Sequence, residues 1–242
     1  MTREKILCFA LDVLFPPRCA NCEVKVKTNA YPLCANCEKS LPINTSLFCA
    51  WCGARAYSLS KVCHAGAPCV LGAATRFDRA AAQRIIHAIK YENKKFLAHP
   101  LGKIIAGYFD RLSAEVGFDN LTFFVIPVPI HKKKILKRGY NQSALLAREF
   151  IKQSNKAESL FFVDDIIFKT KNTPSQTECK TRAERLKNIA GSFETRVPEF
   201  IRGKNFIIID DVCTTGSTVS EIARLLKKSG ARIVLALVFA KA

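Results

Sequence analysis

The stretch FIIIDDVCTTGST, residues 206–218, decides the fold of this chain. Its four leading apolar residues run into Asp210 and Asp211, and a small hydroxylated loop around Gly216 follows. The apolar run is short and rich in β-branched residues, which predicts a buried strand of a parallel sheet. The next residues, VSEIARLLKKSG, have the apolar spacing of a helix that ends at a glycine, and residues 231–240 predict another buried strand. The loop therefore joins a strand to a helix, the place where α/β sheets bind ligands.

This strand–loop–helix unit suits a sugar phosphate. A helix N-terminus offers N–H groups to a phosphate, and the hydroxyls of the loop add further donors. Two acids at the carboxyl end of the strand can accept hydrogen bonds from sugar hydroxyls or bind Mg²⁺. The glycine spacings of a Walker loop and of a Rossmann dinucleotide site are both absent. A strand–turn–helix with an acid pair and no ligand is the alternative interpretation.

The order of acids first and phosphate loop second resembles the PRPP-binding motif of type I phosphoribosyltransferases (PRPP is 5-phosphoribosyl 1-pyrophosphate). The resemblance implies an α/β fold in which a parallel sheet is flanked by helices. It also implies that Asp210 and Asp211 hold the ribose hydroxyls of PRPP, which binds together with Mg²⁺. The implied ligands of the 5′-phosphate are Thr214, Thr215, Gly216, Ser217 and Thr218.

The composition is that of a globular protein without a membrane span. The chain has 242 residues, of which 49% are hydrophobic, enough for one or two domains with a substantial core. No apolar run approaches the roughly 20 residues that cross a bilayer. The apolar residues 5–15 are broken by Asp12 and followed by Pro16 and Pro17, so we expect a short docking helix rather than a signal peptide. A cytoplasmic protein is the expected outcome.

Charge divides the chain into two parts. Residues 1–70 hold 8 Lys and Arg against 4 Asp and Glu, whereas residues 71–242 hold 30 against 16, so most of the net charge of +18 lies in the second part. Such an excess favours a polyanionic partner, such as nucleic acid, a diphosphate or an anionic membrane face. A protein that is merely basic is the alternative. We expect a small cysteine-rich domain over 1–70 and an α/β domain over 71–242.

Nine of the eleven cysteines lie in the first part, and their spacing predicts zinc. A C-x-x-C knuckle supplies two thiolates on one side of a tetrahedral ion, so knuckles are used in pairs. The predicted ligands of the first zinc ion are Cys19, Cys22, Cys34 and Cys37. Those of the second are Cys49, Cys52, Cys63 and Cys69, with His64 as a substitute for one of them.

Other uses of these cysteines are weaker interpretations. Disulfides need an oxidising compartment, and no export signal is visible. Three tandem knuckles without a βαβ frame argue against a redox-active pair. Sequential pairing of the knuckles is the preferred arrangement, and an interleaved cross-brace is the alternative. Cys8, Cys179 and Cys213 are isolated, and we interpret them as ordinary residues.

The middle of the chain carries further strands, helices and basic residues. Residues 79–111 have helical spacing with a break near His99 and Pro100, and residues 121–130 predict a strand. A basic turn over 131–143 precedes a helix, and LFFVDDIIFKT predicts a strand or a strand pair. The polar residues 171–180 predict a loop.

These pieces, in this order, resemble the ComF family of competence-associated proteins, in which a cysteine-rich zinc ribbon is fused to a phosphoribosyltransferase domain. The matching pieces are the tandem knuckles after Phe15-Pro16-Pro17, Lys90-Tyr91, Pro127-Val128-Pro129, Arg138-Gly139-Tyr140-Asn141-Gln142, Thr173-Pro174-Ser175-Gln176, Arg182 with Arg185 and Asn188, and residues 210–218. The spacing of Cys63, His64 and Cys69 departs from the family pattern. In such folds residues 127–142 are placed to contact pyrophosphate, and residues 171–185 to close over the ligand. The implied pyrophosphate or DNA contacts are Lys90, Arg138, Tyr140, Lys180, Arg182 and Arg185.

The resemblance implies a role in natural transformation, in which the protein helps imported single-stranded DNA to enter the cytoplasm. Tyr140 and Trp51 are candidate surfaces for stacking bases, with packing inside the fold as the alternative. An active transferase that moves phosphoribosyl from PRPP to a base or amine is the competing hypothesis. A third is a zinc-ribbon adaptor that docks a DNA helicase, a translocase or a membrane DNA channel at the inner face of the membrane.

Overall fold

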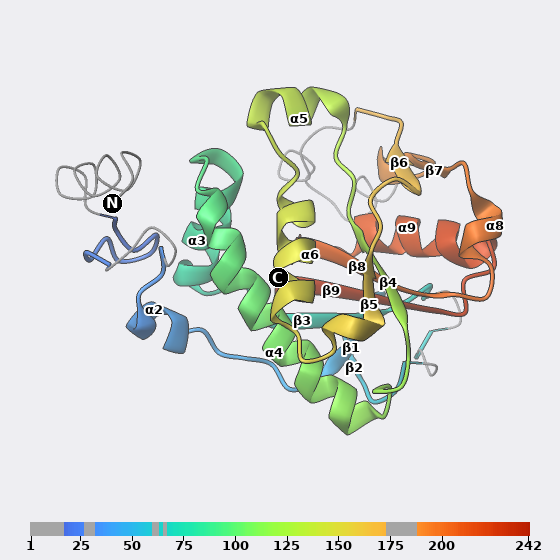
Figure 1. Ribbon diagram of the computed structural model, residues 1–242, viewed down its shortest axis with the longest axis horizontal. Helices are drawn as coiled ribbons and strands as arrows, with labels where there is room; N and C mark the ends of the chain where they lie inside the picture. Colours follow the sequence, from blue (N-terminus) through green and yellow to red (C-terminus); the bar gives the residue numbers. More distant parts are fainter. Residues whose placement is uncertain (1–16, 27–31, 60–62, 65–66, 173–187) are drawn as a thin grey trace.

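The computed structural model describes residues 17–26, 32–59, 63–64, 67–172 and 188–242, and these form a mostly parallel sheet with helices on both faces (Figure 1). The strands, in their order across the sheet, are β2 (Arg55–Ala56), β1 (Leu47–Cys49), β3 (Val70–Arg76), β9 (Ile233–Lys241), β8 (Asn205–Cys213), β4 (Phe123–Pro127) and β5 (Leu160–Phe162). Strands β3, β9, β8, β4 and β5 run parallel, and β1 and β2 extend the β3 edge in antiparallel fashion. The predicted fold class is confirmed.

Strand β8 lies in the middle of this sheet, and its apolar residues serve both faces. Phe206 and Ile208 pack into the core on one face, and Ile207 and Ile209 pack into the core on the other. Successive side chains of a strand point to opposite faces, so a run without polar residues is what burial on both faces requires. Full burial of each such side chain stabilises the fold by about 1.5–3 kcal/mol. The strand is thus fixed rigidly up to the point where its acids begin.

Helices cover the two faces of the sheet separately. Helices α3 (Ala80–Tyr91), α4 (Ala98–Val116) and α6 (Gln142–Gln153) pack on the face of Ile207, and α9 (Ser217–Lys228) packs on the opposite face. The other described elements are α2 (Ala35–Lys39), η1 (Lys95–Leu97), α5 (Lys132–Arg138), η2 (Ala157–Ser159), α8 (Pro198–Ile201) and a separate hairpin-like sheet of β6 (Ile167–Lys169) and β7 (Phe193–Thr195). Among the helices that the structure describes, none is long and apolar enough to cross a membrane.

Two local predictions were wrong. The helical region expected over 79–111 breaks between α3 and η1, not near Pro100, which lies in the first turn of α4. A proline is tolerated there because its missing N–H has no partner within the helix. The basic residues expected as a turn form helix α5, which ends at Gly139 with φ +80°.

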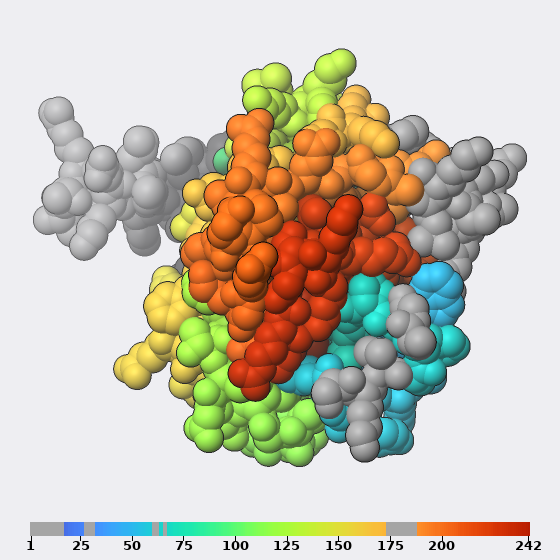
Figure 2. All heavy atoms as spheres, turned by 90° about the vertical axis from the view of Figure 1, so that its right-hand side faces the viewer, coloured from blue at the N-terminus to red at the C-terminus, as the bar shows by residue number. Residues whose placement is uncertain are grey.

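The cysteine-rich front end continues into the main sheet. Strand β1 pairs with β3, so that Leu47 lies opposite Gly72 and Cys49 lies opposite Val70. The boundary expected at residue 70 therefore falls at the first residue of β3. This strand pairs with β1 of the front end on one side and with β9 of the C-terminal part on the other. In Figure 2 the cyan residues of this region lie beside the red residues of the C-terminal part.

Candidate functional site

The two acids that the sequence assigns to ribose lie at the carboxyl end of β8, and Asp211 is held by a lysine. Asp211 is buried, and its Oδ2 lies 2.8 Å from Nζ of Lys90, which comes from the last turn of α3. Burial alone lowers the pKa of Lys90, but the charges of Asp211 and Asp210 outweigh burial and raise it. Lys90, predicted as a pyrophosphate or DNA contact, is thus placed against the acid pair.

Asp210 has a different environment from its neighbour. Oγ of Ser143 donates to Asp210 Oδ1 over 2.8 Å, and the N–H of Asp211 donates to the same oxygen over 2.9 Å. Burial and the adjacent charge of Asp211 raise the pKa of Asp210 to about 7, against the opposing effects of Lys90 and the hydrogen bonds. A carboxyl group that titrates near neutral pH can change its charge when a cation or a ligand rich in hydroxyls arrives.

Two motifs that are separate in the sequence meet beside the acids. Nδ2 of Asn141 donates to the carbonyl of Val128 over 3.0 Å, which ties the start of α6 to the end of β4. Oδ1 of Asn141 also accepts from the N–H of Ser143 over 3.0 Å, as an N-cap does. The cap fixes the first turn of α6, and Ser143 in that turn reaches Asp210.

The loop after the acids has the shape of a phosphate site. Gly216 is the N-cap of α9 with φ +73°, a conformation that favours glycine, and its carbonyl accepts the N–H of Ser220 over 2.9 Å. The hydroxyls of Thr215 and Ser217 lie 3.0 Å apart. Thr214 and Thr218, also predicted as ligands, flank them and are half-buried. The positive end of the α9 dipole therefore faces a loop of hydroxyls, an arrangement that binds anions.

Two polar neighbours of the acids, Ser143 and Lys169, were not predicted from the sequence. Ser143 directly follows the Arg138–Gln142 motif, so its place in the first turn of a helix was a usable signal. Lys169 belongs to β6, and burial together with the charge of Lys134 lowers its pKa to about 8, while Asp210 acts in the opposite direction. Nothing in the sequence indicates that a strand of the small second sheet brings a cation into the electrostatic reach of Asp210.

Tyr140 is not the stacking surface that the sequence suggested. It is 8% exposed, and its hydroxyl donates to the carbonyl of Ile89, so its ring serves packing. Tyr91 is 62% exposed instead, and the guanidinium carbon of Arg138 lies 5.6 Å from the centre of its ring. The ring of Tyr91, rather than that of Tyr140, is therefore accessible to a ligand.

Several predicted positions lie outside the residues that the structure describes. They are the docking helix expected within residues 5–15, the isolated Cys8 and Cys179, the motif at 173–176, and the implied contacts Lys180, Arg182 and Arg185.

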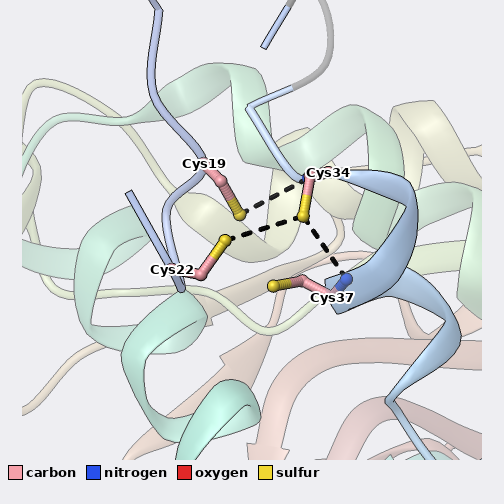
Figure 3. Close-up of side chains that lie close together, drawn as sticks. All are labelled: Cys19, Cys22, Cys34 and Cys37. Atoms are coloured by element: carbon pink, nitrogen blue, oxygen red, sulfur yellow. Dashed lines mark hydrogen bonds between the residues drawn. The ribbon is translucent and has the colours of Figure 1, made fainter. Parts of the chain in front are cut away.

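The first two cysteine knuckles bring four sulfur atoms together (Figure 3). The Sγ atoms of Cys19, Cys22, Cys34 and Cys37 all lie within 4.8 Å of one another. The N–H of Cys34 donates to Cys19 Sγ over 3.4 Å, and the N–H of Cys37 donates to Cys34 Sγ over 3.5 Å. Burial opposes ionisation of Cys19, but backbone N–H groups of Cys22, Cys34 and Asn21 outweigh it and lower its pKa to about 6. Four clustered sulfurs, one of them readily ionised, fit a structural zinc ion.

The second cluster contains His64 in place of Cys69. The ligand atoms of Cys49, Cys52, Cys63 and His64 lie within 4.8 Å of one another, and Cys63 Sγ is 3.1 Å from His64 Nδ1. Cys69 is instead buried in the same apolar core as Cys213, and burial raises its pKa to about 12. The assignment of Cys69 is therefore corrected, because the next residue begins β3 and the chain has already turned into the sheet. Three cysteines and a histidine also fit zinc.

Two known families match separate parts of the chain. Residues 10–67 match the double zinc ribbon domain, and residues 135–242 match the phosphoribosyl transferase domain. Among similar proteins, DNA utilization protein YhgH of Escherichia coli O157:H7 is 30% identical over 150 residues, which cover 62% of this chain and 63% of that protein. Competence protein F of Haemophilus influenzae is 31% identical over 149 residues, 60% of this chain and 62% of that protein. Competence protein ComFC of Bacillus subtilis is 28% identical over 121 residues, 45% of this chain and 40% of that protein.

The chain thus joins a double zinc ribbon to a phosphoribosyltransferase domain. The matches span less than two thirds of the length of these relatives. The domain combination and the relatives named for competence agree with the resemblance to the ComF family that the motifs carry. The double zinc ribbon also supports zinc as the metal of the cysteine clusters.

Proposed function

We propose that this protein binds PRPP with Mg²⁺ at residues 210–218 and single-stranded DNA on an adjoining surface, and that it acts in DNA uptake. The observation that carries the proposal is that the acid pair lies at the end of β8 and the hydroxyl loop follows it directly, at the start of α9. The acids suit the ribose hydroxyls, and the loop suits the 5′-phosphate. Lys90 and Lys169 place positive charge beside the acids, where the pyrophosphate of PRPP and its Mg²⁺ would lie.

The surface for DNA adjoins this site and combines cations with exposed rings. We call it the basic–aromatic surface, and it consists of Tyr91, Lys94, Lys95, Phe96 and Arg138. Tyr91 and Phe96 are 62% and 61% exposed, although large aromatic rings are usually buried. Bases that stack on such rings contribute about 1–3 kcal/mol each, and neighbouring cations neutralise phosphates.

Helix α5 extends the same surface outward. It has no buried residue, and it projects from the top of the molecule in Figure 1. Four of its seven residues are lysines, and Arg138 is its last residue. A strand of nucleic acid that crosses the basic–aromatic surface would therefore meet further positive charge on α5.

The names of the relatives indicate the cellular role. Competence protein F, ComFC and DNA utilization protein YhgH are named for competence and for the use of DNA. We infer a cytoplasmic role for this chain at the inner face of the membrane, where a DNA helicase, a translocase or a DNA channel would hand over the imported strand. The double zinc ribbon is the part that we assign to such a protein partner.

Fluorescence anisotropy with a labelled single-stranded oligonucleotide tests the DNA proposal. The affinity should fall steeply as the salt concentration rises. A plot of log affinity against log salt concentration should have a slope of about −0.7 for each phosphate that the protein neutralises. Tyr91→Ala should weaken binding by about 1–3 kcal/mol, whereas Tyr57→Ala, which removes an 82% exposed ring beyond β2, should not. Binding that ignores salt, or equal losses in the two variants, would show the surface assignment to be wrong.

Transferase activity is the second candidate, favoured by the match to the phosphoribosyl transferase domain. A transferase would release pyrophosphate from PRPP when a base or amine accepts the phosphoribosyl group. Release of pyrophosphate in a screen of acceptors, lost in Asp210→Asn, would establish the enzyme at this site. PRPP binding without release from any acceptor would favour a binding role.

A further inference from the structure

The second metal cluster touches the phosphate loop. A side chain at Gly216 would place its Cβ only 2.6 Å from the carbonyl oxygen of Ala50, so the two backbones are in direct contact. Both residues are buried, and Ala50 belongs to the same apolar core as Cys213 and Val219, which flank the loop. The contact joins segments that are far apart in the sequence and that belong to different domain families.

The position of Ala50 is set by the metal ligands on either side of it. Ala50 and Trp51 are the two residues between Cys49 and Cys52, both of which contribute to the second cluster. The turn closes with the N–H of Gly53 donating to the Cys49 carbonyl over 2.9 Å. A metal bound to Cys49 and Cys52 would therefore fix the backbone of the knuckle, including the carbonyl that meets Gly216.

The Cys49–Cys52 knuckle and the glycine after it make further contacts with the C-terminal part. The guanidinium carbon of Arg224, on α9, lies 6.0 Å from the centre of the Trp51 ring. A Cβ at Gly53 would lie 3.2 Å from Nζ of Lys241, at the end of β9. The knuckle thus contacts Gly216 at the start of α9, Arg224 further along α9, and Lys241 at the end of β9.

The first cluster has different neighbours. Nη1 of Arg84, on α3, donates to the carbonyl of Asn21 over 2.8 Å, and Nζ of Lys103, on α4, lies 3.5 Å from Glu38 Oε1. These contacts lead to the opposite face of the sheet from α9. The first cluster is therefore a matched control for the second.

We propose that the second metal cluster is a strut that holds the phosphate loop in its binding geometry, so that the metal at Cys49, Cys52, Cys63 and His64 sets the affinity of the loop for a ribose phosphate. A loop that is already in its bound shape loses less conformational entropy when the ligand arrives. The affinity part of this inference rests on the phosphate site of the proposed function, whereas the ordering of the loop does not.

Hydrogen exchange measured by mass spectrometry tests the strut on the zinc-loaded full chain. His64→Ala removes an exposed ligand, and the amides of residues 213–219 should then exchange about tenfold faster or more, because local opening costs less free energy. His64→Cys supplies a fourth thiolate and should restore slow exchange. Cys22→Ser, which disrupts the first cluster, should leave these amides unchanged. Equal exchange in His64→Ala and the parent, or equal effects of His64→Ala and Cys22→Ser, would overturn the strut.

Calorimetry with ribose 5-phosphate separates the strut from the proposed function. The Kd should rise about tenfold in His64→Ala and return in His64→Cys, because a loosened loop must be ordered on binding. If His64→Ala speeds loop exchange but the parent protein binds neither ribose 5-phosphate nor PRPP, the loop-ordering role stands and the ligand assignment fails. If the parent binds and His64→Ala binds equally well, the effect of the strut on affinity is refuted while the proposed function stands. Should His64→Ala fail to fold, exchange of Cys22→Ser, in which only the second cluster is intact, is compared before and after removal of zinc by a chelator, and faster exchange after removal supports the strut whereas unchanged exchange overturns it.

Discussion

Lys90→Met tests the buried ion pair at the centre of the candidate site. The substitution removes the ammonium group 2.8 Å from Asp211 Oδ2 and keeps an unbranched apolar chain, so charge is lost with little loss of packing. Asp211 is then a buried charge without that partner, beside a second acid. Removal of one partner from a buried ion pair destabilises a protein by about 3–5 kcal/mol. For a chain of this size we expect a fall in Tm of about 6–20 °C.

Lys94→Met is the matched control for this substitution. Nζ of Lys94 lies 2.7 Å from Glu92 Oε2, but both side chains are more than 40% exposed. Exposed ion pairs contribute about 0–1 kcal/mol, so the control should lose little stability.

Urea unfolding at pH 8, above the pKa of about 7 of Asp210, measures these differences. The double variant Lys90→Met/Asp211→Asn should recover much of the loss, because the unpaired buried charge has gone. Two results would refute the argument that this pair is buried and coupled. One is a loss of unfolding free energy in Lys90→Met no larger than in Lys94→Met, and the other is a double variant no more stable than Lys90→Met.

Three further predictions concern the loop, Asp210 and the metals. Gly216→Ala should cost about 2–4 kcal/mol, from positive φ and the Ala50 carbonyl, whereas Gly203→Ala, with φ +74° and open space around it, should cost about 1–2 kcal/mol; equal shifts in thermal melts would exclude the contact with Ala50. The pKa of Asp210 is raised from 3.8 to about 7 in the fold, so stabilisation by its neutral form is present below pH 4 and is lost as the pH rises to 7. The stability of the parent relative to Asp210→Asn should therefore fall with rising pH by up to about 1.4 kcal/mol per unit between pH 5 and 7, and a constant difference in urea melts would contradict this. Elemental analysis should find zinc at both clusters and the loss of one equivalent in Cys22→Ser; an unchanged zinc content would remove the first site.

The parts of the fold that could be predicted from the sequence are those fixed by local pattern. The apolar run of β8 predicts a strand that is buried on both faces, and the acids and glycine that follow it mark the end of the strand and the turn into the next helix. The helix after the loop is equally local, because its apolar spacing and its terminal glycine lie within twelve residues. Strand β3 was missed because VLGAATR mixes small residues with few β-branched ones, and only its neighbours β1 and β9 make it a strand.

The contacts that define the site depend on packing between distant segments. Lys90 reads as one more cation on a helix, and only the packing of α3 against the sheet brings it to Asp211. Tyr91 directly follows Lys90 and Tyr140 lies two residues after Arg138, and the fold alone decides which ring is exposed. The choice of His64 over Cys69 has the same cause, because strand pairing at Val70 carries Cys69 into the core.

Calorimetric titration of the zinc-loaded protein with PRPP, with and without Mg²⁺, tests the central claim most directly. We predict a saturable one-to-one interaction that needs Mg²⁺ and weakens about tenfold or more, or 1.4 kcal/mol, in Asp210→Asn, since a charged acceptor for the ribose hydroxyls is lost. Asp78→Asn, which changes an exposed carboxylate paired with Arg76, should bind as the parent does. Absence of PRPP binding, or binding that Asp210→Asn leaves intact, would contradict the assignment of residues 210–218 to this ligand.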